Sequence, residues 1–286
     1  MEGGTFMMGN PYETADHDEK TIHEVRVSSF LMGKYEISVG EFRDFIQDAG
    51  YITTAERIGN GAVFIGRKVE SPGDGTWKKP YFTQHESHPA VCVSWWDALE
   101  YCNWRSLREG LKPCYEISSD STVSWDRAAN GYRLATEAEW EYAARSGGTE
   151  IKFAWGNGLP IIGGRKAGNT RDEAAHRHWG LKNYWEGYDD GYVFTAPVDT
   201  FAPNPAGLYG LSGNVYEWCW DWYSEDYYQS SPADNPAGPD RGKMRACRDA
   251  GFGCSIANEV VTSRGKGDPY LAFSWGGFRI ARNAEN

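Results

Sequence analysis

The sequence lacks any apolar run that approaches the roughly 18 residues a membrane-spanning helix needs. It also lacks a charged and apolar leader after Met1, which is followed directly by EGGTFMMG. The chain as given is therefore expected to be soluble, which says little about the compartment of the native protein. Basic residues are in deficit, 29 against 40 acidic ones, and the formal net charge is −11. Such a charge repels phosphate backbones, so we expect no nucleic-acid partner.

Cysteine is sparse and irregularly spaced. The six cysteines fit neither a small disulfide scaffold nor a CxxC zinc pattern, which leaves the redox compartment open. Glycine and tryptophan are abundant instead, with 34 and 13 residues, and 40% of the chain is hydrophobic. This composition predicts an ordered protein in which large aromatic side chains hold many turns. No break in composition divides the chain, so we expect a single domain over 1–286.

Three short helices are predicted from their starts. Ser38 and Thr136 are each followed three residues on by Glu, as in a capping box, and Ser94 precedes a third apolar-periodic stretch that should stop at Gly110. Brief strand signals occur at 23–38, 195–201, 214–223 and 276–282.

Long stretches between these elements are rich in Gly, Pro, Asp and Asn. They occupy 51–88, 148–194 and 224–245. Bare linkers of this length are uncommon inside a compact domain. We therefore expect ordered surface loops, held by side-chain hydrogen bonds or bound ions.

Six motifs follow one another along the chain. They are GGTFMMG at 3–9, HEVRVSSFLMGKYEISVGEF at 23–42, HPAVCVSWWDALEYCNW at 88–104, YRLATEAEWEYAARSG at 132–147, APVDTFAPNPAGLYGLSGNVYEWCWDWY at 196–223 and GFRIAR at 277–282. In this order they resemble the formylglycine-generating-enzyme and sulfatase-modifying-factor family over essentially the whole chain. The resemblance implies an α+β fold, the irregular C-type lectin fold of that family, with little regular secondary structure and with bound calcium.

A cation site is predicted in two glycine-turned loops. The segments GNT and YDDGY place the oxygen donors Asn169 and Asp190 beside flexible backbone carbonyls, as Ca²⁺ requires. The resemblance puts a structural calcium on Asn169, Thr170, Asp190 and Tyr192, the second and fourth through backbone oxygens. The alternative is that Asp190 is a turn residue that caps its own backbone.

A second calcium site of the family would fall on Gly210, Gly213, Val215 and Glu217. Its first ligand normally carries a side-chain oxygen, which Gly210 does not have. We therefore expect this second site to be weak or absent.

The enzymes of this family oxidise a substrate cysteine to formylglycine with a copper ion held by two cysteines five residues apart. Counted back from GFR, those positions fall on Phe252 and Ala257, which have no sulfur. Cys247 and Cys254 lie nearby, seven residues apart and shifted in register. Because soft copper needs both thiolates, the sequence favours no copper and a protein that is not an enzyme. Whether Cys247 and Cys254 form a disulfide or are two buried free thiols stays open.

The altered C-terminal segment, about 245–282, closes with GFRIARN and resembles the variable proteins of diversity-generating retroelements, most closely those of Treponema. That resemblance implies a non-catalytic, ligand-binding protein, displayed on the cell surface as an outer-membrane lipoprotein, monomeric, and directed at an unknown protein or surface ligand. The alternative is a copper-dependent formylglycine-generating enzyme, a sulfatase-modifying oxidase, or a related oxidoreductase. Under the display hypothesis the predicted contact residues are Gly251, Phe252, Gly253, Ile256, Asn258, Glu259, Asp268, Tyr270, Leu271, Phe273 and Ser274.

Overall fold

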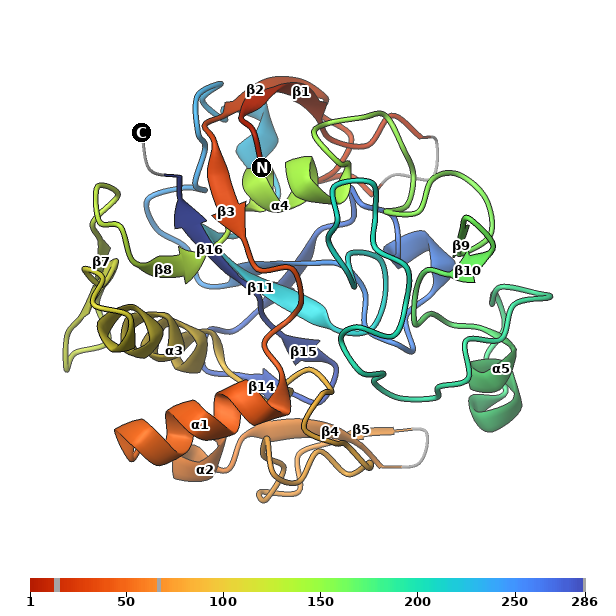
Figure 1. Cartoon of the computed structure of the whole chain (residues 1–286), viewed down its shortest axis with the longest axis horizontal. Helices are drawn as coiled ribbons and strands as arrows, with labels where there is room; N and C mark the ends of the chain where they lie inside the picture. The colour runs from red at the N-terminus through yellow and green to blue at the C-terminus, as the bar shows by residue number, and fades with distance from the viewer. Residues whose placement is uncertain (13–15, 66–67, 285–286) are drawn as a thin grey trace.

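The computed structural model describes residues 1–12, 16–65 and 68–284, and it consists of short helices and small sheets joined by long ordered loops (Figure 1). The helices are α1 (Val39–Ala49), α2 (Thr54–Ile58), α3 (Trp95–Arg108), α4 (Glu137–Ala144) and α5 (Glu173–Trp179), with 3-10 turns at Tyr227–Gln229 and Ile256–Asn258. The strands are β1 (Gly4–Met8), β2 (His23–Val27), β3 (Phe30–Met32), β4 (Gly61–Ile65), β5 (Lys68–Glu70), β6 (Tyr115–Ile117), β7 (Val123–Trp125), β8 (Tyr132–Leu134), β9 (Ile161–Ile162), β10 (Arg165–Lys166), β11 (Tyr216–Trp222), β12 (Arg245–Arg248), β13 (Gly265–Gly267), β14 (Ala272–Phe273), β15 (Gly276–Gly277) and β16 (Ile280–Asn283).

The three predicted helix starts are confirmed. Ser38, Ser94 and Thr136 each accept a hydrogen bond from the backbone three residues on, and each forms a complete capping box. Gly50 ends α1 in the left-handed conformation, with φ of 61°, which a glycine adopts without steric cost.

Two helices and several short strands, among them β4, β5, β9 and β10, form in stretches predicted as loops, and one predicted strand does not form. Helices α2 and α5 lie inside stretches predicted as loops, and they are too short for apolar periodicity to reveal them. The predicted strand at 195–201 is wrong. Its backbone turns instead, and the Thr200 N–H donates to the Pro197 carbonyl at 3.1 Å. Pro197 cannot donate to a sheet ladder, which weakens any strand at this place.

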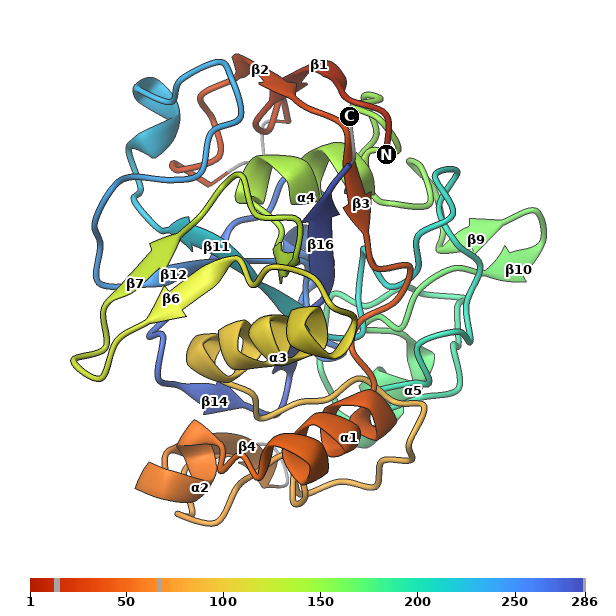
Figure 2. The ribbon, with the colours of Figure 1, turned by 60° about the vertical axis from the view of Figure 1, so that its left-hand side comes forward.

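A four-stranded sheet organises the C-terminal half, in the order β13-β12-β11-β15. Strand β11 is antiparallel to β12 and parallel to β15. Figures 1 and 2 show α4 on one side of β11 and α3 with α1 on the other. Successive side chains of β11 therefore enter two different cores: Trp218 packs in the α1–α3 cluster and Cys219 packs with Trp140 of α4.

In a separate three-stranded sheet, the last strand, β16, lies between β3 and β8. The mixture of few helices and irregular small sheets confirms the α+β expectation. Across the described residues, no helix is both long and apolar enough to span a membrane.

Candidate functional site

Strand β12 carries Cys247 into the middle of the four-stranded sheet. Cys247 pairs with Trp218 of β11 on one side and with Gly265 of β13 on the other. A Cβ added at Gly265 would lie 2.7 Å from the Cys247 Sγ and 3.1 Å from Cε1 of Tyr216. A side chain at this position would crowd both the thiol and the phenol ring, so the close packing here requires glycine. Burial raises the pKa of the Cys247 thiol.

Cys254 reaches the same phenol from the following loop. Its thiol donates to the Tyr216 Oη at 3.6 Å. Burial raises the pKa of Cys254 to about 11, and the hydrogen bond with Tyr216 acts in the opposite direction. All six cysteines are free thiols. The fold thus gathers Cys247, Cys254 and Tyr216, although the two cysteines are not in the family's expected positions.

A surface hollow of about 220 Å³ opens beside this cluster. It is lined by Tyr216, Cys247, Gly265, Lys266, Gly267, Leu271, Phe273 and Trp275. A second, apolar hollow of about 290 Å³ is lined by Gly253, the residue before Cys254, together with Phe64 and Trp179. The thiol cluster is therefore flanked by two places that could receive a substrate segment.

The predicted contact residues divide by burial. Asn258, Asp268 and Tyr270 are exposed; Gly253, Ile256 and Leu271 are half-buried; Gly251, Phe252, Glu259, Phe273 and Ser274 are buried. The expectation of an exposed Phe252 is wrong, because its ring packs against Trp179, Phe194 and Phe82 with centroids 5.6 to 6.0 Å apart. The ligand-binding role of the segment stays a prediction. Only its exposed and half-buried residues could contact a ligand directly.

Glu259 is buried for a different reason. Its carboxylate accepts hydrogen bonds from the Trp185 indole at 2.7 Å and from the Arg171 backbone at 3.1 Å. Burial raises its pKa to about 7. Through these bonds the C-terminal segment contacts the stretch 171–185, which lies between the two segments that carry the predicted calcium ligands.

Three of the four predicted calcium ligands are joined by hydrogen bonds, and Asn169 directly precedes one of them in the chain. Asp190 accepts the Thr170 N–H on one carboxylate oxygen at 2.9 Å and the Tyr192 N–H on the other at 2.7 Å. Asn169 donates to the Phe194 carbonyl and to Asn214, while its Oδ1 is buried without a hydrogen-bond partner. The pKa of Asp190 is raised to about 8 by burial and by the neighbouring Asp172. The bond to Tyr192 matches the turn alternative, and the unpartnered Asn169 oxygen matches a cation ligand.

At the second family site, protein groups satisfy the carboxylate of Glu217. Both of its oxygens accept from Arg279, and Oε2 also accepts from the Trp140 indole at 2.7 Å. A Cβ added at Gly210 would lie 2.5 Å from a carboxylate oxygen of Glu36, so Glu36 fills the space of the missing side chain. In the described part of the chain, no group of three or more His, Cys, Asp or Glu side chains is placed to hold a metal ion.

Comparison with known proteins assigns the chain to a family. The model of the sulfatase-modifying factor enzyme 1-like domain matches residues 1–284. The chain belongs to this sulfatase-modifying-factor family. It is 34% identical to the formylglycine-generating enzyme of Thermomonospora curvata, covering 98% of this chain and 91% of that protein. It is 32% identical to the same enzyme of Streptomyces coelicolor, covering 100% and 88%.

Two solved structures have the same fold. PvdO from Pseudomonas aeruginosa superimposes with a TM-score of 0.72 at 27% identity, covering 99% of this chain and 93% of that one. Treponema denticola variable protein 1 superimposes with a TM-score of 0.67 at 26% identity, covering 99% and 94%. The irregular lectin-type fold is confirmed. So is the resemblance to the formylglycine-generating enzymes and to the Treponema variable protein.

The expectation that the chain is not an enzyme is overturned. Four curated relatives at 32 to 34% identity, each matching at least 98% of this chain, are named formylglycine-generating enzyme. The expectation rested on a gap-free count back from GFR, which compared sequence positions and not positions in space. Sequence reasoning also missed Tyr216. The pairing of β11 with β12 places this ring near Cys247, and the loop after β12 brings Cys254 into hydrogen-bond contact with it.

Proposed function

We propose that this family member is a copper-dependent oxidoreductase of the formylglycine-generating type, which acts on a cysteine-bearing peptide. The observation that carries the proposal is the gathering of the two C-terminal thiols around Tyr216, with Cys254 in hydrogen-bond contact and Cys247 lining an open hollow. Identity of 34% to a formylglycine-generating enzyme over nearly the whole chain supports the same reaction class.

The donor set fits copper in kind. Thiolates are the protein ligands that suit Cu(I), and two sulfurs are the number that the family's site uses. The ion would be held by Cys247 and Cys254, and it would supply the oxygen-dependent oxidation of a substrate thiol. Raised pKa values of both thiols mean that metal binding must displace their protons, so affinity should increase with pH.

The surrounding side chains prepare the site for a peptide. Burial and the nearby Cys254 raise the pKa of Tyr216, so its phenol keeps its proton and can donate to a Cys254 thiolate. Phe273 and Trp275 form apolar walls of the hollow, which exclude water from an inserted side chain. Lys266 is exposed at the same hollow and presents a positive charge to an incoming acidic residue.

The test has a binding part and an activity part. Cu(I) is titrated against a colorimetric copper chelator, and aldehyde is then measured on a cysteine-containing sulfatase peptide. Cys247→Ser and Cys254→Ser should each lose copper binding and aldehyde formation. Cys114→Ser is the matched control, since that buried thiol donates to the Gly131 carbonyl at 3.3 Å and lies outside the hollow. A variant with both substitutions, Cys247→Ser and Cys254→Ser, should bind no copper at this site. If its copper affinity equals that of the wild type, the thiol site is refuted.

We also propose that Asn169, Thr170, Asp190 and Tyr192 hold a structural Ca²⁺, supported by the buried, unpartnered Oδ1 of Asn169. A calcium chelator should lower the melting temperature, and Asp190→Ala should remove that response. Asp189→Ala is the control, because Asp189 is more exposed and its carboxylate pairs with Arg177 at 2.6 Å. An unchanged melting temperature on chelation would contradict the calcium site.

A ligand-binding face is a second candidate function, favoured by the likeness to Treponema denticola variable protein 1 and by the exposed Asn258, Asp268 and Tyr270. If this face is diversified, genes from sister isolates should differ mainly at codons for 251–274. Uniform sequences there would remove this candidate. Surface location through a lipid anchor belongs with it, and the 28% identity to the chaperone protein LppX of Paenibacillus barcinonensis is its support.

A further inference from the structure

Strand β12 carries a buried cation, Arg245, whose guanidinium group lies between two tryptophan rings. Its guanidinium carbon lies 3.6 Å from the ring centre of Trp95 and 3.4 Å from that of Trp222. The side chain is fixed further by one hydrogen bond, from Nη1 to the Trp220 carbonyl at 2.6 Å. Arg245 is only 2% exposed, so its conformation is set before any ligand arrives.

Arg245 has no carboxylate partner in the described part of the chain. Its Nε is buried without a hydrogen-bond partner, and no ion pair forms within 4.0 Å. Burial lowers the pKa of Arg245 to about 9, and Asp221 opposes that change. Asp221 is itself shifted towards its neutral form by burial and by Glu137, so it offsets little of the positive charge. A buried, charged guanidinium with free donors is costly unless something else accepts its hydrogen bonds.

A hollow of about 250 Å³ opens onto this guanidinium. It is lined by Val123, Trp125, Arg127, Trp220, Trp222, Ala237, Gly238, Pro239, Asp240 and Arg245. Its walls come from the β6–β7 hairpin and from loop 237–240, which Figure 2 shows on the side of the molecule where β11 and β12 lie. The Trp125 and Trp220 rings are 5.1 Å apart, so the hairpin packs directly on β11.

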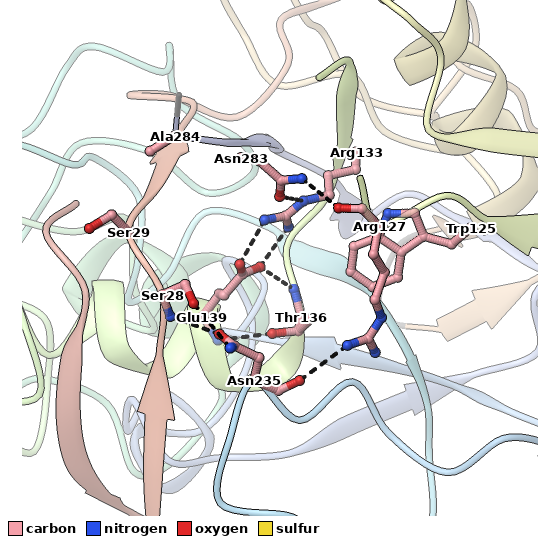
Figure 3. A pocket seen from close by; sticks show the side chains of 10 residues that line it. All are labelled: Ser28, Ser29, Trp125, Arg127, Arg133, Thr136, Glu139, Asn235, Asn283 and Ala284. Carbon is pink, nitrogen blue, oxygen red and sulfur yellow. Dashed lines mark hydrogen bonds and ion pairs between the residues drawn. The ribbon is translucent and has the colours of Figure 1, made fainter. Parts of the chain in front are cut away.

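Arg127 supplies a second positive charge to the same hollow. It is exposed, stacks with its guanidinium carbon 4.8 Å from the centre of Trp125, and donates only a long bond of 3.5 Å to the Asn235 carbonyl. Figure 3 shows the adjoining hollow, of about 310 Å³, which shares Trp125 and Arg127. There Arg133 is already engaged by two 2.7 Å bonds to Glu139. Of the arginines that line these two hollows, Arg127 and Arg245 have no carboxylate partner among the described residues, and they can bind an anion from solution.

We propose that the hollow between Arg127 and Arg245 binds the oxyanion group of a small ligand: a carboxylate, sulfate or phosphate. Planar guanidinium groups match the geometry of such oxygens, and a charge-assisted hydrogen bond is stronger than a neutral one. The indole walls of Trp220 and Trp222 suit a ring attached to that group. Asp240 is exposed at the hollow, and its charge disfavours anions more strongly the more negative charges they carry.

The experiment measures ligand-dependent melting temperature and intrinsic tryptophan fluorescence with sodium acetate, benzoate, sulfate and phosphate. Ionic strength is held constant with sodium chloride, so general salt effects are equal in all samples. At least one anion should give a saturable response in the wild type. Arg127→Gln should weaken that response about tenfold, as expected for loss of a hydrogen bond to a charged group.

Arg241→Gln is the matched control, because Arg241 is an exposed arginine beside Asp240 that does not line the hollow. It should keep the wild-type response. A stronger response to benzoate than to acetate identifies a ring-bearing carboxylate, whereas a response to sulfate or phosphate alone identifies a tetrahedral oxyanion. Identical responses in wild type, Arg127→Gln and Arg241→Gln would overturn the proposal, and so would a wild type that responds to none of the four anions. Arg127 lies on the surface, so this outcome does not depend on whether an Arg245 variant folds.

Discussion

Arg248 and Arg245 lie three residues apart on one strand, and both are almost completely buried, yet their surroundings differ in kind. Arg248 donates to Glu137 at 3.1 Å and to Glu141 at 2.7 Å. Arg264 joins this cluster by binding both oxygens of Glu137 at 2.8 and 3.0 Å. Arg245 has aromatic faces and one carbonyl instead, and no carboxylate pairs with it in the described chain.

The difference separates two uses of a buried charge. A paired cation neutralises buried carboxylates, so removing it leaves them uncompensated. A cation held by aromatic rings keeps its charge and part of its donor set for a ligand. We therefore expect Arg248 to contribute mainly to stability and Arg245 mainly to binding.

The largest effect is expected from Arg248→Met. Among the cations of the described residues, Glu141 then pairs with Arg145 alone, at 3.3 Å, and Glu137 with Arg264 alone, so the free energy of unfolding should fall by about 3–5 kcal/mol. Urea denaturation followed by circular dichroism measures this change. Arg248→Lys, which retains the charge but not the fork geometry, should lose less. A loss below about 1 kcal/mol for Arg248→Met would place it among ordinary substitutions and would contradict the assigned role.

The pH dependence of the same cluster comes next in size. Although burial acts to raise the pKa of Glu137, Arg264 and Arg248 lower it from 4.5 to about 2. A carboxyl group whose pKa is lower in the folded than in the unfolded protein stabilises the fold at pH values above its unfolded-state pKa. That contribution is lost as the pH falls from about 4.5 to about 2. The loss should be on the order of 3 kcal/mol. Denaturation curves of the wild type and Glu137→Gln should therefore converge in acid; parallel pH profiles would rule out Glu137 as the titrating group.

Local chemistry explains which parts of the fold were predictable. The capping boxes at Ser38, Ser94 and Thr136 lie within four residues each, so the sequence alone displays them. The hydrogen bonds of Asp190 to Thr170 and Tyr192 also lie within the segments that the sequence singled out, and calcium binding there stays a prediction.

Long-range contacts account for the remainder. The residues of the Cys254–Tyr216 contact are 38 positions apart in the sequence. The stacking of the Arg245 guanidinium on Trp95 likewise joins β12 to the distant helix α3. Phe252 was predicted to contact a ligand, which requires an exposed side chain, yet rings from three other segments bury it. Such packing depends on loop paths that no local pattern encodes.

A smaller effect is expected from Arg245→Met. The substitution removes the cation–aromatic contacts but also removes a buried charge without a carboxylate partner, so the two contributions partly cancel. The free energy of unfolding should change by no more than about 1 kcal/mol, while the anion response of the hollow disappears. Denaturation and anion titration of the same sample measure both. A destabilisation as large as that of Arg248→Met would show that the two arginines do not differ in the proposed way.

The smallest effect is expected from Arg26→Gln at the surface. Arg26 binds Asp234 at 2.6 Å, a distance as short as those in the buried cluster, but both side chains are 63% exposed. Water and salt screen such a pair, so its loss should cost about 0.2–1 kcal/mol. A double-mutant cycle with Asp234→Asn, run at low and high sodium chloride, measures the coupling and its decrease with salt. A salt-independent coupling as large as the Arg248 effect would mean that distance alone decides the strength of these pairs. A weak, salt-dependent coupling would instead show that burial, and not distance, makes the Arg248 pairs stronger than the Arg26 pair. Arg248 and Arg245 are both buried, so the presence or absence of a carboxylate partner decides the role of each.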